Sequence, residues 1–327
     1  MNIIHNICLY SCIINTKGIR KMSDVIFEAR NLTKKYKNQY ALDDVSITLK
    51  KDRIYGFIGE NGAGKSTLMK IMAGLIFPTS GDMTFMGETD PAAIEKKRKS
   101  VGTMIEGPYI YPGYSVRQNV ELQRLLVGNP DESATDRMIE LVGLSDSRKK
   151  KAKKLSMGMK QRLGIAMAMV GTPRFLILDE PINGLDPKNI VTLRGMLKKI
   201  NQDNDCTIFV SSHILSELYL LATDFIFIHK GKIIETVTHE QLEEKCSQYV
   251  FVRNNNIPET VTILEKHFPD ISYKVETDDA IKIFGKPEIM TELSGYMMQA
   301  GITVSELAGK EMSLEEYFIG ITGGERQ

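Results

Sequence analysis

The sequence has no tryptophan, only four cysteines in 327 residues, and almost no excess of one charge. Lysine and arginine total 42 against 41 aspartates and glutamates, which leaves a formal net charge of +1. No overall electrostatic field therefore points to nucleic acid as a partner, and partners have to be inferred from local motifs. The cysteines form none of the paired patterns of structural zinc sites, and their scarcity indicates a reducing cytoplasm.

Long hydrophobic runs are also missing. A membrane-spanning helix needs about 20 consecutive apolar residues, whereas 163–170 is among the longest apolar stretches here. We therefore expect no segment that crosses a bilayer. The apolar stretch 7–14 is followed rather than preceded by basic residues, which argues against a signal peptide. We expect residues 1–21 to be a disordered extension or a misassigned start, because the sequence from Met22 onward already has the features of the start of a domain.

The apolar content of 42% is enough to bury a core, and the length allows one large domain and a small one. Alternation of apolar and polar residues over 25–50, broken at 37–39, predicts antiparallel strands around a turn. Residues 53–58 predict a buried strand that leads through glycines into a helix at 65–73.

Later segments predict helices first and buried strands after them. Residues 115–145 carry apolar residues at helical spacing, and Ser115 with Gln118 forms a capping box. The runs 175–178 and 207–210 are continuously apolar, as in buried parallel strands, and 225–236 predicts a strand pair with a turn at 230–231. From about residue 240 shorter strands and helices alternate, which predicts a small α+β accessory domain over 241–327.

A phosphate-binding pattern follows the strand at 53–58. The pattern comprises Gly59, Glu60, Asn61, Gly62, Ala63, Gly64, Lys65, Ser66 and Thr67. Its glycines let backbone N–H groups turn toward phosphate oxygens, and the helix start adds its positive dipole end. We expect Lys65 to reach the β- and γ-phosphates of ATP and Ser66 to bind Mg²⁺.

Two adjacent carboxylates, Asp179 and Glu180, end the apolar run 175–178. We expect Asp179 to hold Mg²⁺ and Glu180 to orient or deprotonate the attacking water. Such a pair also ends strands without any catalytic role. Here, however, it follows the phosphate-binding loop 59–67, which matches the P-loop pattern, by about a hundred residues.

Residues 155–161, Leu-Ser-Met-Gly-Met-Lys-Gln, resemble the signature motif of the ABC (ATP-binding cassette) family. Met157 and Met159 replace the usual glycine and glutamine, while Ser156 and Gly158 are retained. Together with the P-loop, this resemblance implies an α/β P-loop NTPase fold. The implied cassette spans 22–240, with a mixed sheet core, an antiparallel β subdomain and a helical subdomain at about 105–160.

Further residues resemble the family's motifs over 25–240. Asp186 closes a stretch similar to the D-loop, and His213 resembles the switch histidine that contacts the γ-phosphate. Tyr36 occupies the place of the aromatic residue that stacks on adenine, although a tyrosine on a strand is more often a packing residue.

Glu106 stands where the family has a glutamine that senses Mg²⁺ and water. A carboxylate there would be a stronger metal ligand, so Glu106 is a candidate for the metal site and for coupling. This glutamate, the signature variant and the trailing α+β domain resemble the ATPases of exporters for self-protection against bacitracin and lantibiotics. The resemblance implies antibiotic export.

In this family the two halves of a nucleotide site come from different subunits, so a homodimer and separate membrane permease subunits are implied as partners. The implied location is the cytoplasm, peripheral on the inner face of the membrane. Tyr109, Tyr111 and Tyr114 are candidates for permease docking, with core packing an equal alternative. The basic cluster 148–154 suits lipid headgroups, but a solvated face is the more common explanation.

A non-transport ABC ATPase is an alternative function. Translation types carry two cassettes and repair types carry long coiled coils, and neither feature is present. A regulatory nucleotide-binding protein without hydrolysis is a second alternative, which the intact carboxylate pair argues against.

Overall fold

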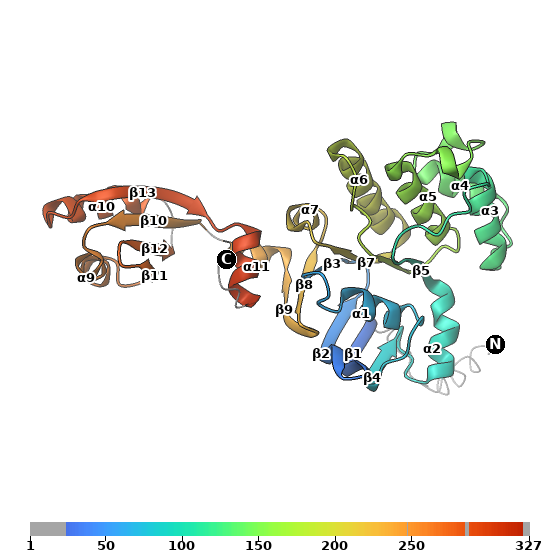
Figure 1. The fold of residues 1–327 in the computed structure, drawn as a ribbon, viewed down its shortest axis with the longest axis horizontal. Coiled ribbons are helices and arrows are strands. Elements are labelled where there is room, and N and C mark those ends of the chain that lie inside the picture. Colours follow the sequence, from blue (N-terminus) through green and yellow to red (C-terminus); the bar gives the residue numbers. More distant parts are fainter. Residues whose placement is uncertain (1–23, 247, 285–287, 323–327) are drawn as a thin grey trace, which may run out of the picture.

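The computed structural model describes residues 24–246, 248–284 and 288–322 (Figure 1). The extension predicted for residues 1–21 lies outside this described part. The described chain forms a large unit with two sheets and a smaller unit that stands apart from it in Figure 1.

A three-stranded antiparallel sheet begins the large unit. Its order is β2-β1-β4, with β1 (Val25–Tyr36), β2 (Gln39–Lys50) and β4 (Ser80–Phe85). Strands β1 and β2 pair along their length down to Tyr36 opposite Gln39. Lys37 in the connecting turn has a φ of 52°. The antiparallel pair predicted for 25–50 is therefore confirmed.

A six-stranded sheet forms the centre of the large unit. Its order is β5-β6-β7-β3-β8-β9, with β3 (Ile54–Ile58), β5 (Val101–Met104), β6 (Phe175–Leu178), β7 (Thr207–Ser212), β8 (Asp224–His229) and β9 (Lys232–Thr238). All neighbours are parallel except the hairpin of β8 and β9. Strands β3, β6 and β7 are buried throughout, which explains their continuous apolar sequence. The loops after these three strands meet at one edge of the sheet.

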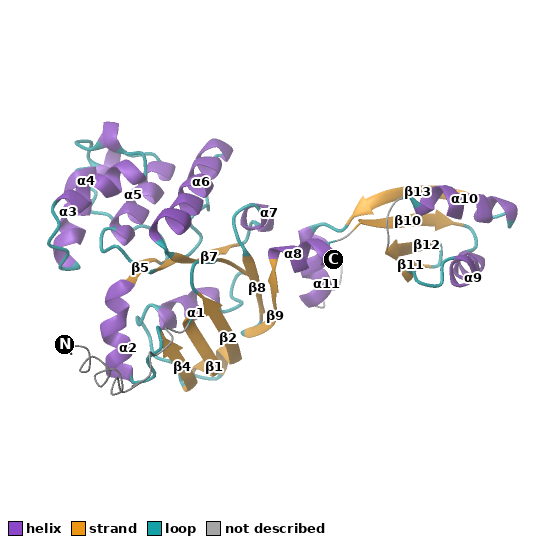
Figure 2. Ribbon diagram, turned by 180° about the vertical axis from the view of Figure 1, so that it is seen from behind, coloured by secondary structure: helices purple, strands orange, loops and turns teal. Residues whose placement is uncertain are grey.

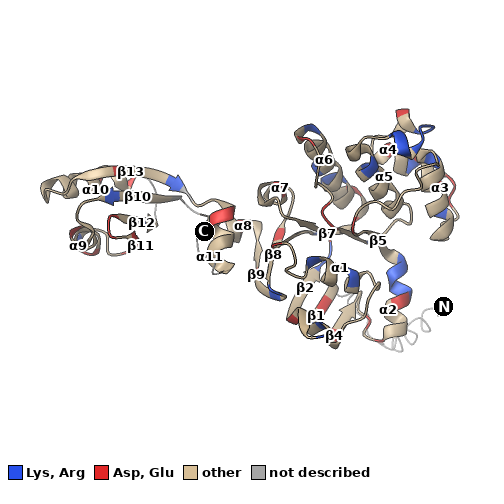
Figure 3. Ribbon diagram, in the orientation of Figure 1, with Lys and Arg blue, Asp and Glu red and all other residues tan. Residues whose placement is uncertain are grey.

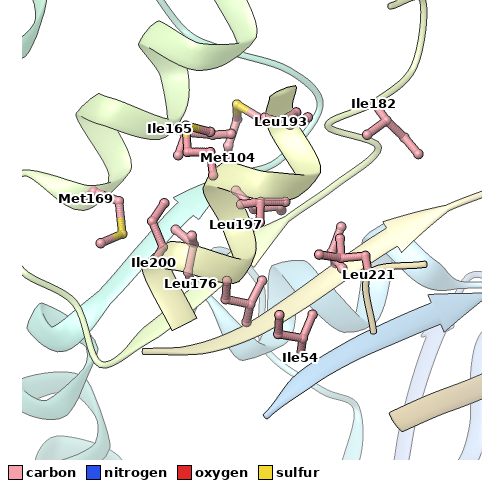
Figure 4. Packing of buried hydrophobic residues seen from close by; sticks show 14 of the residues in the cluster. Ile54, Met104, Ile165, Met169, Leu176, Ile182, Leu193, Leu197, Ile200 and Leu221 are labelled. Atoms are coloured by element: carbon pink, nitrogen blue, oxygen red, sulfur yellow. The ribbon is translucent and has the colours of Figure 1, made fainter. Parts of the chain in front are cut away.

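Helices cover the central sheet on one face, and α1 with the antiparallel sheet covers the other (Figure 2). The helices of the large unit are α1 (Lys65–Met72), α2 (Pro91–Lys97), α3 (Val116–Leu126), α4 (Ser133–Leu141), α5 (Met157–Met169), α6 (Pro187–Asn204), α7 (Leu215–Tyr219), α8 (His239–Lys245) and α11 (Leu314–Thr322). Figure 4 shows Leu193, Leu197 and Ile200 of α6 over Leu176 and Ile54 of the sheet. This apolar stripe explains why α6 lies flat on the strands.

Helices α3, α4 and α5 pack together at one end of the large unit (Figure 1). The predicted capping box is present, because Ser115 and Gln118 bond each other's backbone N–H groups. Asn119 is fully buried and bonds both the N–H and the carbonyl of Tyr111. This amide therefore holds the loop that leads into α3.

The smaller unit has the order β-α-β-β-α-β along the chain. Its elements are β10 (Gln248–Asn254), α9 (Ile257–His267), β11 (Ser272–Thr277), β12 (Ala280–Phe284), α10 (Ile289–Gln299) and β13 (Val304–Glu311). The strands form an antiparallel sheet in the order β11-β12-β10-β13, with an apolar core of its own. This arrangement is the split β-α-β type.

The last helix, α11, differs from the expectation for residues 241–327. It returns to the large unit, where the Phe318 ring stacks on Phe227 of β8 at a centroid distance of 6.1 Å. Tyr317 of the same helix donates a hydrogen bond to Glu235 of β9. Helical periodicity predicts an apolar face on α11 but does not say which unit that face covers.

No helix in the described residues is both long and apolar enough to span a membrane. Figure 3 shows basic and acidic residues interspersed over both units, in keeping with the small net charge.

Replacing Phe318 by alanine should lower the free energy of unfolding by about 3 kcal/mol, because a buried aromatic side chain is lost from the contact with Phe227. The matched control is Ile319→Ala, since Ile319 lies on the same helix and is 45% exposed. Urea titration followed by circular dichroism measures both. Equal losses for the two variants would contradict the packing of α11 on the large unit.

Candidate functional site

Residues 59–67 form the loop between β3 and α1, at the edge where the parallel strands end. Two of its glycines are required by close backbone approaches. A Cβ at Gly59 would lie 2.5 Å from the carbonyl oxygen of Ile228, and one at Gly64 would lie 2.4 Å from that of Ala41. Gly64 also has a φ of 110°, which residues with a side chain rarely adopt. The fold itself therefore requires these two glycines, apart from the phosphate binding expected from the sequence.

The ammonium group of Lys65 lies inside this loop. It donates to the carbonyl oxygens of Gly59, at 2.6 Å, and Glu60, at 3.2 Å. It is also 3.8 Å from Oε1 of Glu180. Burial lowers the pKa of Lys65, while the carboxylates of Glu180 and Asp179 act in the opposite direction. A cation is therefore held where phosphate oxygens would enter the loop.

Asp179 follows β6 directly and is 6% exposed. Each of its carboxylate oxygens accepts one hydroxyl hydrogen bond. Oδ2 accepts from Ser66 Oγ of α1 at 2.8 Å, and Oδ1 accepts from Ser211 Oγ of β7 at 2.6 Å. The end of β6, helix α1 and strand β7 therefore meet at one carboxylate.

Glu180, the next residue, has a φ of 49°, which is uncommon for a residue with a side chain. Its backbone N–H donates to Ser211 Oγ at 2.9 Å. Its Oε2 lies 2.8 Å from Nδ1 of His213 and accepts from the His213 N–H at 3.3 Å. The structure therefore brings Glu180 and His213, which were predicted separately as site residues, into direct contact. A carboxylate held in this way can orient a water molecule or accept its proton.

Lys65, Asp179 and Glu180 line a cavity of about 210 Å³, whereas His213 contacts Glu180 from outside that lining. Its lining residues are Ala41, Glu60, Asn61, Gly62, Gly64, Lys65, Ser66, Thr67, Asp179 and Glu180. The P-loop and carboxylate residues predicted from the sequence thus share one hollow, with a buried cation on one side and two carboxylates on the other.

The oxygens of Ser66 and Asp179 suit a hard divalent cation. Mg²⁺ is usually held by one or two carboxylates together with substrate phosphates and water. Within the described residues, no group of three or more His, Cys, Asp or Glu side chains is assembled for a metal. The donor set therefore fits Mg²⁺ that arrives with a nucleotide better than a metal held by protein alone.

Ser156, Gly158 and Asp186 lie elsewhere, at the starts of α5 and α6. Ser156 Oγ accepts from the N–H of Met159 at 3.4 Å, and Asp186 accepts from the N–H of Asn189 at 3.0 Å. A Cβ at Gly158 would lie 2.8 Å from Cγ of Asn189. Glycine at this position therefore lets the two helix starts approach each other, and none of these residues lines the cavity around Lys65.

Tyr36 and Glu106 also lie outside the cavity lining. The Tyr36 ring is 49% exposed, and the ammonium of Lys34 lies 5.0 Å from its centroid. Glu106 follows β5 with a φ of 60°, and its Oε1 is 2.5 Å from Nζ of Lys70 on α1. This hydrogen bond raises the pKa of Lys70. The carboxylate expected to contribute to the metal site is thus paired with a lysine.

Sequence reasoning missed Ser211, Ala41 and Lys70. Two adjacent serines, Ser211 and Ser212, end the buried strand just before His213, but this pattern does not say which of them reaches Asp179. Ala41 contributes a backbone carbonyl close to Gly64, and a backbone contact has no signature in residue type. Lys70 lies one helical turn past Ser66, so its role depends on where residue 106 is placed.

Residues 42–183 match the family described as ABC transporter. The bacitracin transport ATP-binding protein BcrA of Bacillus licheniformis is 36% identical over 299 residues, which cover 91% of this chain and 98% of that protein. The chain belongs to the ABC transporter family. Within this family it is an ATP-binding subunit and an ATPase.

A second relative agrees with this membership of the ABC transporter family, and a solved structure shows the same fold. The lantibiotic transport ATP-binding protein SrtF of Streptococcus pyogenes is 41% identical over 223 residues, which cover 67% of this chain and 95% of that protein. The dimeric ATP-binding cassette MJ0796, solved with ADP and phosphate, superposes with a TM-score of 0.59 at 24% identity. That match covers 65% of this chain and 98% of that chain. It confirms the predicted cassette fold.

Replacing Lys65 by alanine should lower the rate of ATP hydrolysis by about 100-fold or more, since a charged donor is lost from the phosphate site. The control is Lys198→Ala, which removes the same charge from an exposed position on α6. Phosphate release by the two purified variants provides the measurement. Turnover by Lys65→Ala at the control's rate would show that this loop does not bind the reacting nucleotide.

Proposed function

We propose that this ABC ATPase drives a separate membrane permease that exports peptide antibiotics of the bacitracin or lantibiotic type. The observation that carries the proposal is the cavity that combines Lys65, Ser66, Asp179 and Glu180. The exported class is inferred from the names of the two relatives, which are transport proteins for bacitracin and for a lantibiotic. The proposed location is peripheral, on the cytoplasmic face of the membrane.

The proposed roles within the cavity follow from its contacts. Lys65 and the N–H groups of the glycine loop bind the phosphates of ATP. Ser66 and Asp179 hold Mg²⁺, which would neutralise phosphate charge when bound. Glu180 orients the attacking water and accepts its proton, and His213 holds the Glu180 carboxylate at 2.8 Å.

A second copy of the chain completes the site in this proposal. Ser156 caps helix α5 outside the cavity, so its own chain does not bring it to the phosphates. The serine and the N-terminus of α5 can bind the γ-phosphate held by a partner copy, since a helix start favours anions. Asp186 and Asn189, which lie beside Gly158, belong to the same proposed interface.

Replacing Glu180 by glutamine should trap an ATP-bound dimer, because the amide keeps the size of the side chain but does not accept a proton. Size-exclusion chromatography with light scattering, in the presence of ATP and Mg²⁺, measures the mass. Glu244→Gln on the exposed face of α8 is the control and should remain a monomer after turnover. If Glu180→Gln stays monomeric with ATP, the composite site is wrong.

The proposed permease contact is a second cavity of about 240 Å³ between β5, α3 and α5. Its lining includes Met104, Gly107, Pro108, Tyr109 and Val127. Tyr109 is 75% exposed, so it is not a core residue, and the exposed side chains Leu125 and Leu126 lie on the neighbouring α3. An apolar surface of this kind fits a helix from another protein.

Glu106 connects this second cavity to the nucleotide site in our proposal. It precedes Gly107 and Pro108, which line the cavity, and its carboxylate bonds Lys70 of the helix that begins at Lys65. A shift of residues 107–109 by a permease would therefore pull on α1. A metal role for Glu106 remains a prediction, and we propose coupling as its main role.

Replacing Tyr109 by aspartate should reduce permease capture at least tenfold, because a charge enters an apolar contact. Tagged chain is purified from detergent-solubilised membranes of the native cell, and mass spectrometry quantifies the multi-span proteins that co-purify. Met298→Asp, at an 83% exposed position on α10, is the control. Undiminished capture by Tyr109→Asp would exclude this surface as the dock.

A further inference from the structure

We propose that Ser211 is a positioning residue for ATP hydrolysis, whose single hydroxyl sets the orientation of Asp179 and Glu180 together. This inference rests on the roles proposed above for those two carboxylates. No motif in the sequence singles out Ser211, which lies two residues before His213 at the end of β7.

The hydroxyl of Ser211 is used as donor and as acceptor at once. It donates its only proton to Oδ1 of Asp179 at 2.6 Å, and it accepts the backbone N–H of Glu180 at 2.9 Å. Ser211 has no exposed surface, so water does not compete for these bonds. A hydroxyl has one proton to donate, and the two contacts therefore fix its direction.

The first contact decides which oxygen of Asp179 faces the nucleotide. With Oδ1 bonded to Ser211, Oδ2 is directed to Ser66 at 2.8 Å. Oδ2 of Asp179 and Oγ of Ser66 are the two oxygens that we propose as ligands of Mg²⁺. Without Ser211 only the bond from Ser66 restrains the carboxylate, so its rotation about its last bond is less restricted and the two oxygens are less firmly placed.

The second contact holds the backbone of Glu180 in an unfavourable conformation. A φ of 49° at a residue other than glycine persists only where the surroundings impose it. The bond from the Glu180 N–H to β7 supplies such a constraint, since it ties the residue to a strand that is buried throughout. The side chain of Glu180 is thereby aimed between Lys65 and His213.

Ser212 provides a matched control for a purely structural role. It is the next residue of β7, it is equally buried, and its Oγ accepts the N–H of Ile214 at 3.0 Å. No hydrogen bond joins the Ser212 side chain to Asp179 or Glu180 in the described part of the chain. Loss of the Ser212 hydroxyl therefore removes a backbone hydrogen bond at an equally buried position without releasing either carboxylate.

The experiment compares Ser211→Ala and Ser212→Ala in the purified full-length chain. Residues that orient the ligands of a metal typically contribute 10- to 100-fold to metal affinity or activity. We expect kcat of Ser211→Ala to fall about 10- to 100-fold, with little change in KM for ATP. In Ser211→Ala, Mg²⁺ should also increase the affinity for a fluorescent ATP analogue less than it does in the wild-type chain. The affinity measured without Mg²⁺ should be the same in both chains. Ser212→Ala should keep wild-type values in both assays.

Two results would overturn the inference. One is a folded Ser211→Ala chain whose kcat lies within threefold of the wild-type kcat. The other is a loss of kcat in Ser212→Ala that equals the loss in Ser211→Ala. If thermal unfolding shows that Ser211→Ala does not fold, Ser211→Cys takes its place, because a thiol has similar size and is a weak donor and acceptor. Hydrolysis by Glu180→Gln at the wild-type rate would instead refute the proposed catalytic role of Glu180.

Discussion

The carboxylate of Asp179 is the point on which the nucleotide site depends. Its two oxygens accept from Ser66 and Ser211, so one buried side chain joins the P-loop helix to β7 across the end of β6. A buried carboxylate without such donors would raise the free energy of the folded state, since desolvation of a charge is costly. The two hydroxyls offset part of that cost and restrain the geometry at the same time.

The central sheet explains why these groups meet. Strands β3, β6 and β7 run parallel, so the loops that follow them share one edge, and the P-loop, the carboxylate pair and His213 all occupy such loops. Strand β5 joins the same edge and leads into Glu106. The proposed reacting groups and the proposed coupling residue therefore belong to one continuous framework.

The hairpin of β8 and β9 links this framework to the smaller unit. The backbone of Ile228 lies against Gly59, and the neighbouring Phe227 packs on Phe318 of α11. Tyr317 and Lys245 both bond Glu235 of β9, so α8 and α11 are held on the same strand. The chain enters the smaller unit after α8 and leaves it before α11, which places both connections beside the hairpin.

The sequence determined the order of most strands and helices, the residues of the phosphate cavity apart from Ala41 and, through the family resemblance, the fold class. These are local properties, because a glycine loop between strand and helix, an apolar run that ends in Asp179 and Glu180, and a capping box at Ser115 each depend on neighbours along the chain. The resemblance of residues 155–161 to a family motif further implied that the nucleotide site is shared between two copies of the chain.

Only the tertiary structure decided which distant groups touch. Ser211 and Asp179 are 32 positions apart, and Lys70 and Glu106 are 36 apart, so no local pattern pairs them. The same reason applies to α11, whose apolar face fits either unit by periodicity but packs on Phe227. The same limit applies to Gly158. Its motif suggested an approach to phosphate, whereas the packing adds Asn189, whose side chain would have to shift to admit a Cβ at this position.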